Sequence, residues 1–153
     1  MYEKEEKRKV FDKRNPADEG RGKFFIPFPS DAKHYIYHPK MKPEYLYLYT
    51  LIIDYYNEAE GRAFPSLVTL EMVYQKHRDT ISKYLDILKE VGLIDFERKQ
   101  DGYIPLEPLS QERFFATFPE AKERYLKSIK KRDKQQASGR ERMREYRQKK
   151  GYA

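Results

Sequence analysis

The sequence predicts a mostly α-helical protein that carries one small β-hairpin. A long apolar and aromatic segment starts at Pro43, and two shorter amphipathic segments follow it between residues 64 and 94. The second of these ends at Gly92, a residue typical of helix C-termini. A Gln-Asp-Gly turn at residues 100–102 then separates two short runs with β character. Three helices followed by a hairpin are therefore the expected centre of the fold.

The composition excludes several classes of protein. The chain has 153 residues, of which 37% are charged, and its mean hydropathy is −1.01. It contains no cysteine, which excludes disulfides, thiolate metal sites and a cysteine nucleophile. The N-terminus is charged from the start, unlike a secretory signal, and no apolar run approaches the roughly 20 residues of a membrane span. A cytoplasmic protein with no membrane partner is expected.

Basic charge is concentrated at the C-terminal end of the chain. Residues 125–153 hold 11 Lys and Arg against 3 Asp and Glu, whereas residues 1–124 hold 21 against 22. This asymmetry favours a polyanion as the partner of the C-terminal segment, most simply nucleic acid. The alternative is a tail that only improves solubility.

The chain divides into three predicted parts. Residues 1–22 mix charges of both signs and are predicted to form a flexible arm. Residues 23–109 are predicted to form the folded domain, and residues 110–153 a basic helical tail. At the start of the domain, SDAKHYIYHP (residues 30–39) is expected to form a loop or a short strand.

The segment from Pro43 to Glu58 is the most hydrophobic part of the chain. Its alternation of Tyr and Leu could indicate a strand, but its length and the proline at its first position favour a helix. Apolar side chains would cover most sides of this helix, so it should lie deep in a core or contact a second subunit. A homodimer through the outer face of this Tyr-rich helix is the alternative to burial within one chain.

Two shorter helices are predicted after it. Ser66 is the expected N-cap of a helix over residues 67–74, and a tight turn leads to a third helix from about Arg78 to Val91. Ile81, Leu85 and Leu88 recur at helical spacing and should form the buried face of the third helix.

The rest of the chain is predicted to contain a hairpin and further helices. Leu93–Arg98 and Tyr103–Leu106 are the expected strands of the hairpin. In the tail, Ser110 should cap a short helix and Pro119 should begin a longer one. We expect Ser138-Gly139 to interrupt this helix before a last basic one.

The order of these elements is that of a winged helix-turn-helix, in which the hairpin is the wing. Two short helices joined by a tight turn hold the second at a steep angle, so that its N-terminal turn can enter the major groove of double-stranded DNA. Residue types that reach base edges and phosphates cluster at that end. The predicted DNA contacts are Lys76, His77, Arg78, Thr80, Ser82 and Lys83 from the third helix and the turn before it, Arg98, Lys99, Gln100 and Tyr103 from the wing, and Arg140, Arg142, Arg144, Arg147, Lys149 and Lys150 from the tail, where they would neutralise phosphates.

Several short motifs carry a resemblance to a known family. FPS at residues 64–66 opens the second helix, and Arg78 with Thr80-Ile81 opens the third. Leu88 with Gly92-Leu93-Ile94 closes it. In these motifs the chain resembles the winged helix-turn-helix domains of replication initiators and regulators of Gram-positive plasmids and phages.

The resemblance extends from about Phe24 to Glu107 and implies specific contacts. Ser66 would bind a phosphate, while Arg78, Thr80, Ser82 and Lys83 would lie in the groove. The basic segment RERMREYRQKK (residues 140–150) also resembles segments that follow winged helices in phage replisome proteins.

Three positions depart from the pattern of that family. Gln75 stands where glycine is common in the turn, and His77 stands where serine or asparagine usually caps the helix. Asp79 occupies a position that is commonly basic or neutral; it would weaken phosphate binding, but it could accept a hydrogen bond from cytosine.

Catalytic and metal sites find little support. His34 and His38 have a spacing that could hold a metal on a helix, but Pro39 follows them and no third ligand is evident. There is no glycine-rich phosphate loop and no assignable Ser/His/Asp arrangement. No cofactor, no metal and no enzymatic activity are therefore predicted.

The sequence thus predicts a site-specific DNA-binding protein that acts in plasmid or phage replication initiation or its control. One alternative is a transcriptional repressor of a mobile element. Another is an adaptor that binds a replication or segregation protein.

Overall fold

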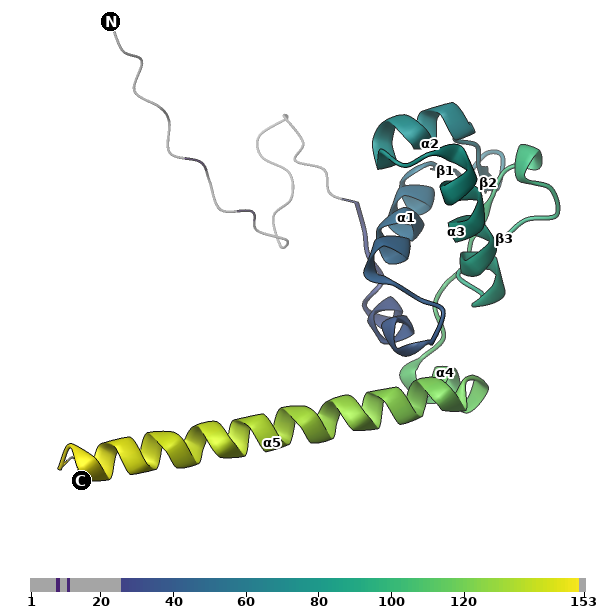
Figure 1. Cartoon of the computed structure of the whole chain (residues 1–153). Helices are drawn as coiled ribbons and strands as arrows, with labels where there is room; N and C mark the ends of the chain where they lie inside the picture. Colours follow the sequence, from purple (N-terminus) through teal and green to yellow (C-terminus); the bar gives the residue numbers. More distant parts are fainter. Residues whose placement is uncertain (1–7, 9–10, 12–25, 152–153) are drawn as a thin grey trace, which may run out of the picture.

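The computed structural model describes Arg8, Phe11 and residues 26–151 of the chain (Figure 1). The predicted arm over residues 1–22 lies outside the described residues, apart from Arg8 and Phe11. A body of short helices and two small hairpins is followed by one long projecting helix, which confirms the mostly helical fold with a small hairpin. The elements are η1 (Ser30–Tyr37), α1 (Pro43–Asp54), β1 (Tyr56–Asn57), β2 (Arg62–Ala63), α2 (Leu67–Tyr74), α3 (Arg78–Glu90), β3 (Ile94–Asp95), η2 (Lys99–Asp101), β4 (Ile104–Pro105), α4 (Gln111–Thr117) and α5 (Pro119–Lys149).

The first element is a helix rather than the predicted loop or strand. η1 is a 3-10 helix whose inward side chains include Ala32, His34 and Tyr35. The Tyr35 hydroxyl accepts a hydrogen bond from the Leu109 backbone N–H at 2.8 Å, and the His34 Nε2 lies 2.8 Å from the Leu109 carbonyl oxygen. These partners are more than 70 residues away, so no local pattern could have indicated this helix.

Helix α1 begins at Pro43 as predicted but ends earlier, at Asp54. Tyr56 and Asn57 form β1 instead, which pairs antiparallel with β2. Six of the 12 residues of α1 are buried in the core, and the exposed large apolar side chain on it is Tyr47, at 51% exposure. Because α1 buries most of its apolar surface within the chain, it leaves little for a second subunit.

Helices α2 and α3 are the two predicted after α1, and their ends match the expected caps. The Ser66 hydroxyl oxygen accepts a hydrogen bond from the Thr69 N–H at the start of α2. Gly92, with a φ of 86°, follows the end of α3 in the left-handed conformation that glycine tolerates best. The apolar residues predicted for the buried face of α3, namely Ile81, Leu85 and Leu88, are all fully buried.

The wing is a short hairpin that is continuous with the first hairpin. β3 pairs antiparallel with β4, and Tyr103 exchanges two backbone hydrogen bonds with Ala63 in β2. Tyr103 is only 2% exposed and its ring packs edge-on against Phe96. The expectation that Tyr103 contacts DNA from the wing is therefore corrected: its side chain belongs to the core.

The folded body continues past residue 109, where the tail was expected to begin. Phe114 in α4 is fully buried, and its ring centroid lies 4.3 Å from that of Tyr35. Ala121 in the first turn of α5 is also buried. The unpacked part of the chain therefore starts within α5, after Tyr125.

Helix α5 is continuous through Ser138-Gly139, which corrects the predicted interruption. Glycine in a helix interior costs only about 1 kcal/mol relative to alanine, and the flanking lysine, glutamine, alanine and arginine residues favour helix. No helix in the described part of the chain is long and apolar enough to cross a membrane.

Gly102 in the wing can be tested as a position that requires glycine. Its φ is 91°, and a Cβ there would lie 2.9 Å from the Ala63 carbonyl oxygen and the Phe64 ring. We expect Gly102→Ala to lower the free energy of unfolding by about 1–3 kcal/mol in urea titrations. Gly139→Ala is the matched control: nothing lies within 4 Å of that position, so the change should stabilise α5 by about 0.5–1 kcal/mol. Equal effects of the two substitutions would contradict this account of the wing.

The two buried histidines predict a loss of stability in mild acid. Burial lowers the pKa of His34 and of His38 below 6.5. The unfolded chain therefore binds more protons than the folded protein near that pH, so protonation of these histidines favours unfolding. The free energy of unfolding is not reduced by them above pH 6.5, and it decreases as the pH falls below that value. We expect the free energy of unfolding to decrease between pH 7.5 and pH 5, and His34→Gln, which can still donate to Leu109, to reduce that decrease. A pH dependence that is unchanged in His34→Gln would rule out this residue as a source.

Candidate nucleic-acid interface

The N-terminal turn of α3 lies at the surface of the body and carries a cluster of basic residue types. His77 caps the helix, because its Nδ1 accepts a hydrogen bond from the Asp79 N–H at 3.2 Å. Lys76, His77 and Arg78 are all exposed. The preceding residue, Gln75, has a left-handed backbone with a φ of 57°, which makes the sharp turn between α2 and α3. This geometry presents three adjacent side chains at the positive end of the helix dipole.

Two of these cations are paired with carboxylates on neighbouring helices. Arg78 Nε donates to Glu71 Oε1 at 2.8 Å, and Lys76 Nζ lies 3.7 Å from Glu44 Oε2. Surface pairs of this kind contribute at most about 1 kcal/mol each. Phosphate oxygens can therefore replace the carboxylates without a large loss of stability.

The outward face of α3 carries three carboxylates beside one lysine. Asp79, Lys83, Asp86 and Glu90 are exposed and follow one another at spacings of four, three and four residues, so they share one side of the helix. Asp86 pairs with Lys99 of the wing at 2.9 Å, and Glu90 pairs with Lys40 at 2.6 Å. These contacts offset two of the three carboxylates. Lys83 has no ion-pair partner among the described residues and points to solvent beside them.

The wing is fastened to α3 by Lys99. Its ammonium group donates to the hydroxyl and carbonyl oxygens of Ser82 and lies 5.8 Å from the centre of the Phe96 ring. Ser82 is therefore half-buried and already hydrogen-bonded, which leaves it poorly placed for a base contact. Thr80 is half-buried as well.

At the tip of the wing, Arg98 and Gln100 are exposed. Arg98 forms two hydrogen bonds to the carboxylate of Asp101, at 2.8 and 3.3 Å. The structure thus brings the predicted residues of α3 and of the wing together, but not all of them are available to a ligand. Tyr103 is buried, Lys99 and Ser82 are bonded to each other, and Thr80 is half-buried.

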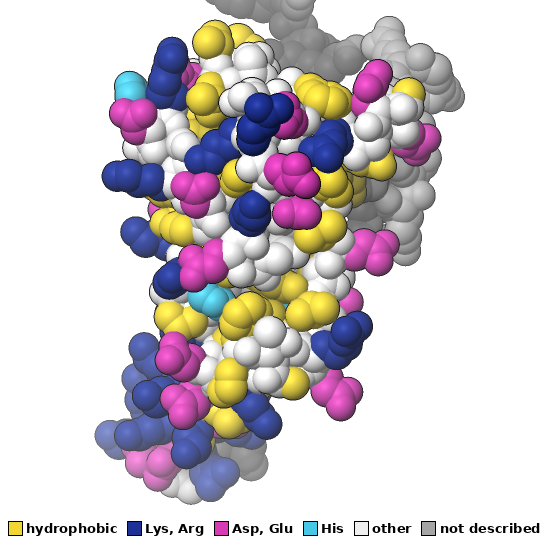
Figure 2. Space-filling view, turned by 90° about the vertical axis from the view of Figure 1, so that its right-hand side faces the viewer, with side chains coloured by type: hydrophobic (Ala, Val, Ile, Leu, Met, Phe, Trp, Pro, Cys, Tyr) yellow, Lys and Arg dark blue, Asp and Glu magenta, His cyan; other side chains and the backbone are white. Residues whose placement is uncertain are grey.

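The predicted cations of the tail lie on the part of α5 that projects from the body. All six, from Arg140 to Lys150, are exposed. They are far from the start of α3, because α5 leaves from the other end of the body (Figure 1). Figure 2 shows the resulting charge distribution: Lys and Arg gather at its lower end, at the height of α4 and α5, whereas both signs alternate above.

Helix α2 presents an exposed apolar surface that the sequence analysis did not identify. Val68 and Met72 of this helix are each 65% exposed, and Phe64, three residues before the helix, is 51% exposed. Val68 lies two positions before the buried Leu70, and Met72 lies two positions before the buried Tyr74. This spacing places Val68 and Met72 on the side of the helix opposite to the buried residues. Ser66, which the resemblance assigns to a phosphate contact, is exposed at the start of the same helix.

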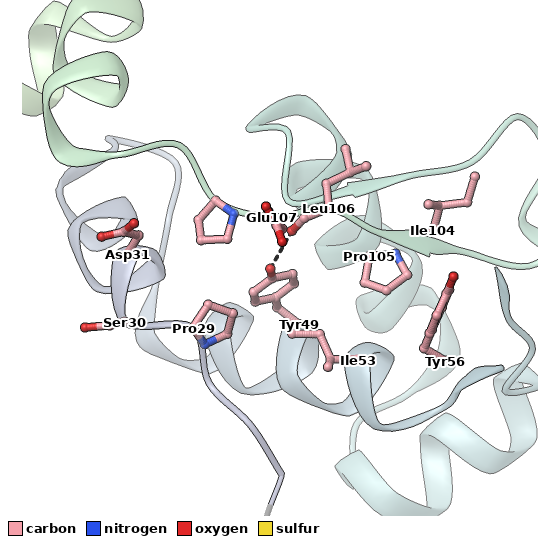
Figure 3. Close-up of a pocket in the computed structure, with 11 residues that line it drawn as sticks. Pro29, Ser30, Asp31, Tyr49, Ile53, Tyr56, Ile104, Pro105, Leu106 and Glu107 are labelled. Carbon is pink, nitrogen blue, oxygen red and sulfur yellow. Dashed lines mark hydrogen bonds between the residues drawn. The ribbon is translucent and has the colours of Figure 1, made fainter. Parts of the chain in front are cut away.

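A groove between α1 and residues 104–108, which comprise β4 and the segment after it, is unsuited to phosphate. It has a volume of about 620 Å³, and Tyr49 and Ile53 of α1 face Pro105 and Leu106 across it (Figure 3). The Tyr49 hydroxyl donates to the Leu106 carbonyl oxygen at 2.6 Å. The charged side chains that line the groove, Asp31 and Glu107, are both acidic.

The two histidines with metal-like spacing have structural partners. His34 contacts the Leu109 carbonyl oxygen, and His38 Nδ1 accepts a hydrogen bond from the Lys40 N–H at 3.1 Å. No group of three or more potential metal ligands is present among the described residues.

Comparison with known proteins agrees with the helix-turn-helix geometry. Residues 40–94 match the model of a family described as "Helix-turn-helix domain". The match covers α1, α2 and α3 and ends at the first residue of the wing. No curated protein matches the chain, and no solved structure matches it either. The protein therefore contains a helix-turn-helix domain, which supports binding to DNA.

The left-handed turn at Gln75 provides a test of the helix-turn-helix geometry. A residue with a Cβ is strained in this conformation by about 1–2 kcal/mol, whereas glycine is not. We expect Gln75→Gly to raise the free energy of unfolding by about 0.5–1 kcal/mol, after allowance for the greater freedom of glycine in the unfolded chain. Urea titration measures the change. A lower stability would show that the bond from Gln75 Nε2 to the Met72 carbonyl, at 2.7 Å, outweighs the strain.

Proposed function

We propose that the protein binds a specific site on double-stranded DNA and that α3 reads the major groove. The observation that carries the proposal is the exposed N-terminal turn of α3, where Lys76, His77 and Arg78 project from a capped helix inside a helix-turn-helix domain. Lys83 lies one further turn along the same helix. The proposed role is binding without catalysis, in the cytoplasm where the DNA is found.

Base contacts, rather than phosphate attraction, would make the main contribution of α3 to specificity. Arginine and lysine recognise guanine through its O6 and N7 atoms, and a carboxylate accepts from the amino group of cytosine. Arg78, Asp79 and Lys83 provide this combination at the exposed end of α3. The acidic outward face would disfavour random sequences, because an unpaired carboxylate near phosphates lowers affinity.

We further propose that this binding serves replication initiation or its control on a plasmid or phage of Gram-positive bacteria. The support is the resemblance of the motifs at residues 64–66, 78–81 and 88–94 to those of replication initiators. Transcriptional repression of a mobile element is the alternative within the same binding mode. Location of the bound site at a replication origin or across a promoter would separate the two roles.

The proposal predicts that two residues of α3 are required for site binding. Arg78→Ala/Lys83→Ala should weaken binding to a duplex selected by the protein from a random library by roughly 100-fold, since each base contact contributes about 1–3 kcal/mol. Binding is measured by fluorescence anisotropy. Lys33→Ala/Lys122→Ala removes the same charge from exposed positions away from α3 and should leave site binding nearly unchanged.

The selection itself can contradict the proposal. If no sequence is enriched, or if the Arg78→Ala/Lys83→Ala protein binds the enriched site as tightly as the unchanged protein, α3 does not read DNA.

A second candidate function is that of an adaptor for a replication or segregation protein. The exposed apolar side chains Val68 and Met72 on one side of α2 favour it, because such side chains are common where proteins associate. Under this function the Arg78→Ala/Lys83→Ala protein would still bind its partner, whereas Val68→Ser/Met72→Ser would not.

A further inference from the structure

The base of α5 is held on the body by aromatic packing and by one arginine. The ring centroid of Tyr125 lies 5.1 Å from that of Tyr37 and 5.1 Å from that of Phe115. Arg124 Nη1 donates to the carbonyl oxygens of Tyr37 and His38, at 3.3 and 3.0 Å. Because these partners belong to η1, to the residue after it and to α4, they fix the direction in which α5 leaves the body.

Helix α5 leaves the body at the end opposite to the exposed start of α3. α3 has 13 residues and is therefore about 20 Å long. Its far end, Glu90, pairs with Lys40, which lies three residues after η1, and η1 in turn contacts α5. In Figure 1, α2 lies at the top of the body and α5 runs below it. A duplex that receives the start of α3 thus lies a helix length away from the base of α5.

The projecting part of α5 extends still further away from that duplex. After Tyr125 the helix continues to Lys149, about 36 Å beyond its last packed turn. It projects from the body without touching α2, α3 or the wing (Figure 1). The sequence analysis expected the cations of α5 to contact the same DNA as α3. This geometry instead keeps them away from the straight duplex that α3 would hold.

The chemistry of the projecting helix fits a nucleic-acid duplex. Arg140, Arg144 and Arg147 have the spacing of one helix face, whereas Glu141 and Glu145 share a different face. An α-helix with its side chains is about 10–12 Å wide and the major groove about 12 Å wide, and free-standing basic helices enter that groove. Proteins that bind single strands instead stack the bases on several aromatic rings. In the described part of α5 beyond Tyr125, Tyr146 is the one exposed aromatic residue, so a duplex fits this helix better than a single strand.

We propose that the projecting part of α5 binds a second duplex segment, so that one molecule bridges two stretches of DNA. This inference rests on the proposed function, in which α3 binds the first duplex. Arg140, Arg144 and Arg147 would face the phosphates of the second, and the binding would be independent of its sequence.

A capture experiment with the full chain tests the bridge. Biotinylated duplex that carries the site selected by the protein is fixed on beads, the protein is bound to it, and a second fluorescent duplex of random sequence and different length is added. The unchanged protein should retain the second duplex on the beads. Arg140→Gln/Arg144→Gln/Arg147→Gln should still bind the bead duplex but should retain at least about tenfold less of the second, since three counterion-releasing contacts are lost.

A matched control removes the same charge near the base of α5. Lys33→Gln/Arg113→Gln/Lys122→Gln changes three exposed cations of the body and leaves the projecting face intact, so it should retain the second duplex as well as the unchanged protein does. Circular dichroism confirms that α5 stays helical in each variant.

Three results would overturn the bridge. The first is undiminished capture by Arg140→Gln/Arg144→Gln/Arg147→Gln while Arg78→Ala/Lys83→Ala loses the bead duplex, which refutes the bridge and leaves the function of α3 standing. The second is loss of all binding in the α5 variant with no effect of Arg78→Ala/Lys83→Ala, which makes α5 the DNA site and refutes both proposals. The third is capture of a single-stranded oligonucleotide in preference to the duplex.

Discussion

The burial of one side of α3 determines which of its polar side chains can reach a ligand. Ile81, Leu85 and Leu88 are fully buried, and the helix can rotate very little without exposing one of them. Each fully buried side chain of this size contributes about 1.5–3 kcal/mol. That constraint points Lys83 outward, turns Ser82 toward the wing, and places the capped end of α3 at the surface. The turn at Gln75 and the cap at His77 then set the residue at which α3 begins.

The distribution of charge differs between the body and α5. On the body, cations and carboxylates are matched: Arg78 with Glu71, Lys99 with Asp86 and Lys40 with Glu90. A matched surface has little attraction for phosphates in general and depends on specific contacts. The excess of cations lies on α5, where few carboxylates accompany it. Under the proposed function, sequence reading and non-specific attraction therefore belong to different parts of the molecule.

Local chemistry made much of the fold predictable. The caps at Ser66 and Ser110, the proline at Pro43 and the glycine at Gly92 each signal a boundary through a backbone hydrogen bond or a permitted dihedral angle, so α2, α3 and the start of α1 could be predicted to within a residue. The helical spacing of Ile81, Leu85 and Leu88 identified the buried face of α3 in the same way.

Features that depend on distant partners could not be predicted. η1 forms because Tyr35 and His34 meet Leu109, and Tyr103 is buried because it pairs with Ala63. In the candidate interface, the sequence indicated the residue types at the start of α3, but the bond from Lys99 to Ser82 and the apolar side of α2 appear only when the elements are packed together. The direction of α5 likewise depends on its contacts with η1. The sequence therefore identified the cations of α5, but it could not indicate where they lie relative to α3.

The central claim is that DNA meets the N-terminal end of α3, and site-specific photo-crosslinking measures this directly. A benzophenone amino acid is placed at Lys83 in one protein and at Glu90 in another; both positions are exposed on the same side of α3, two turns apart. The account predicts crosslinks to a selected duplex from position 83 and almost none from position 90. Equal crosslinking from both, or crosslinking from position 90 alone, would mean that DNA does not approach this end of the helix.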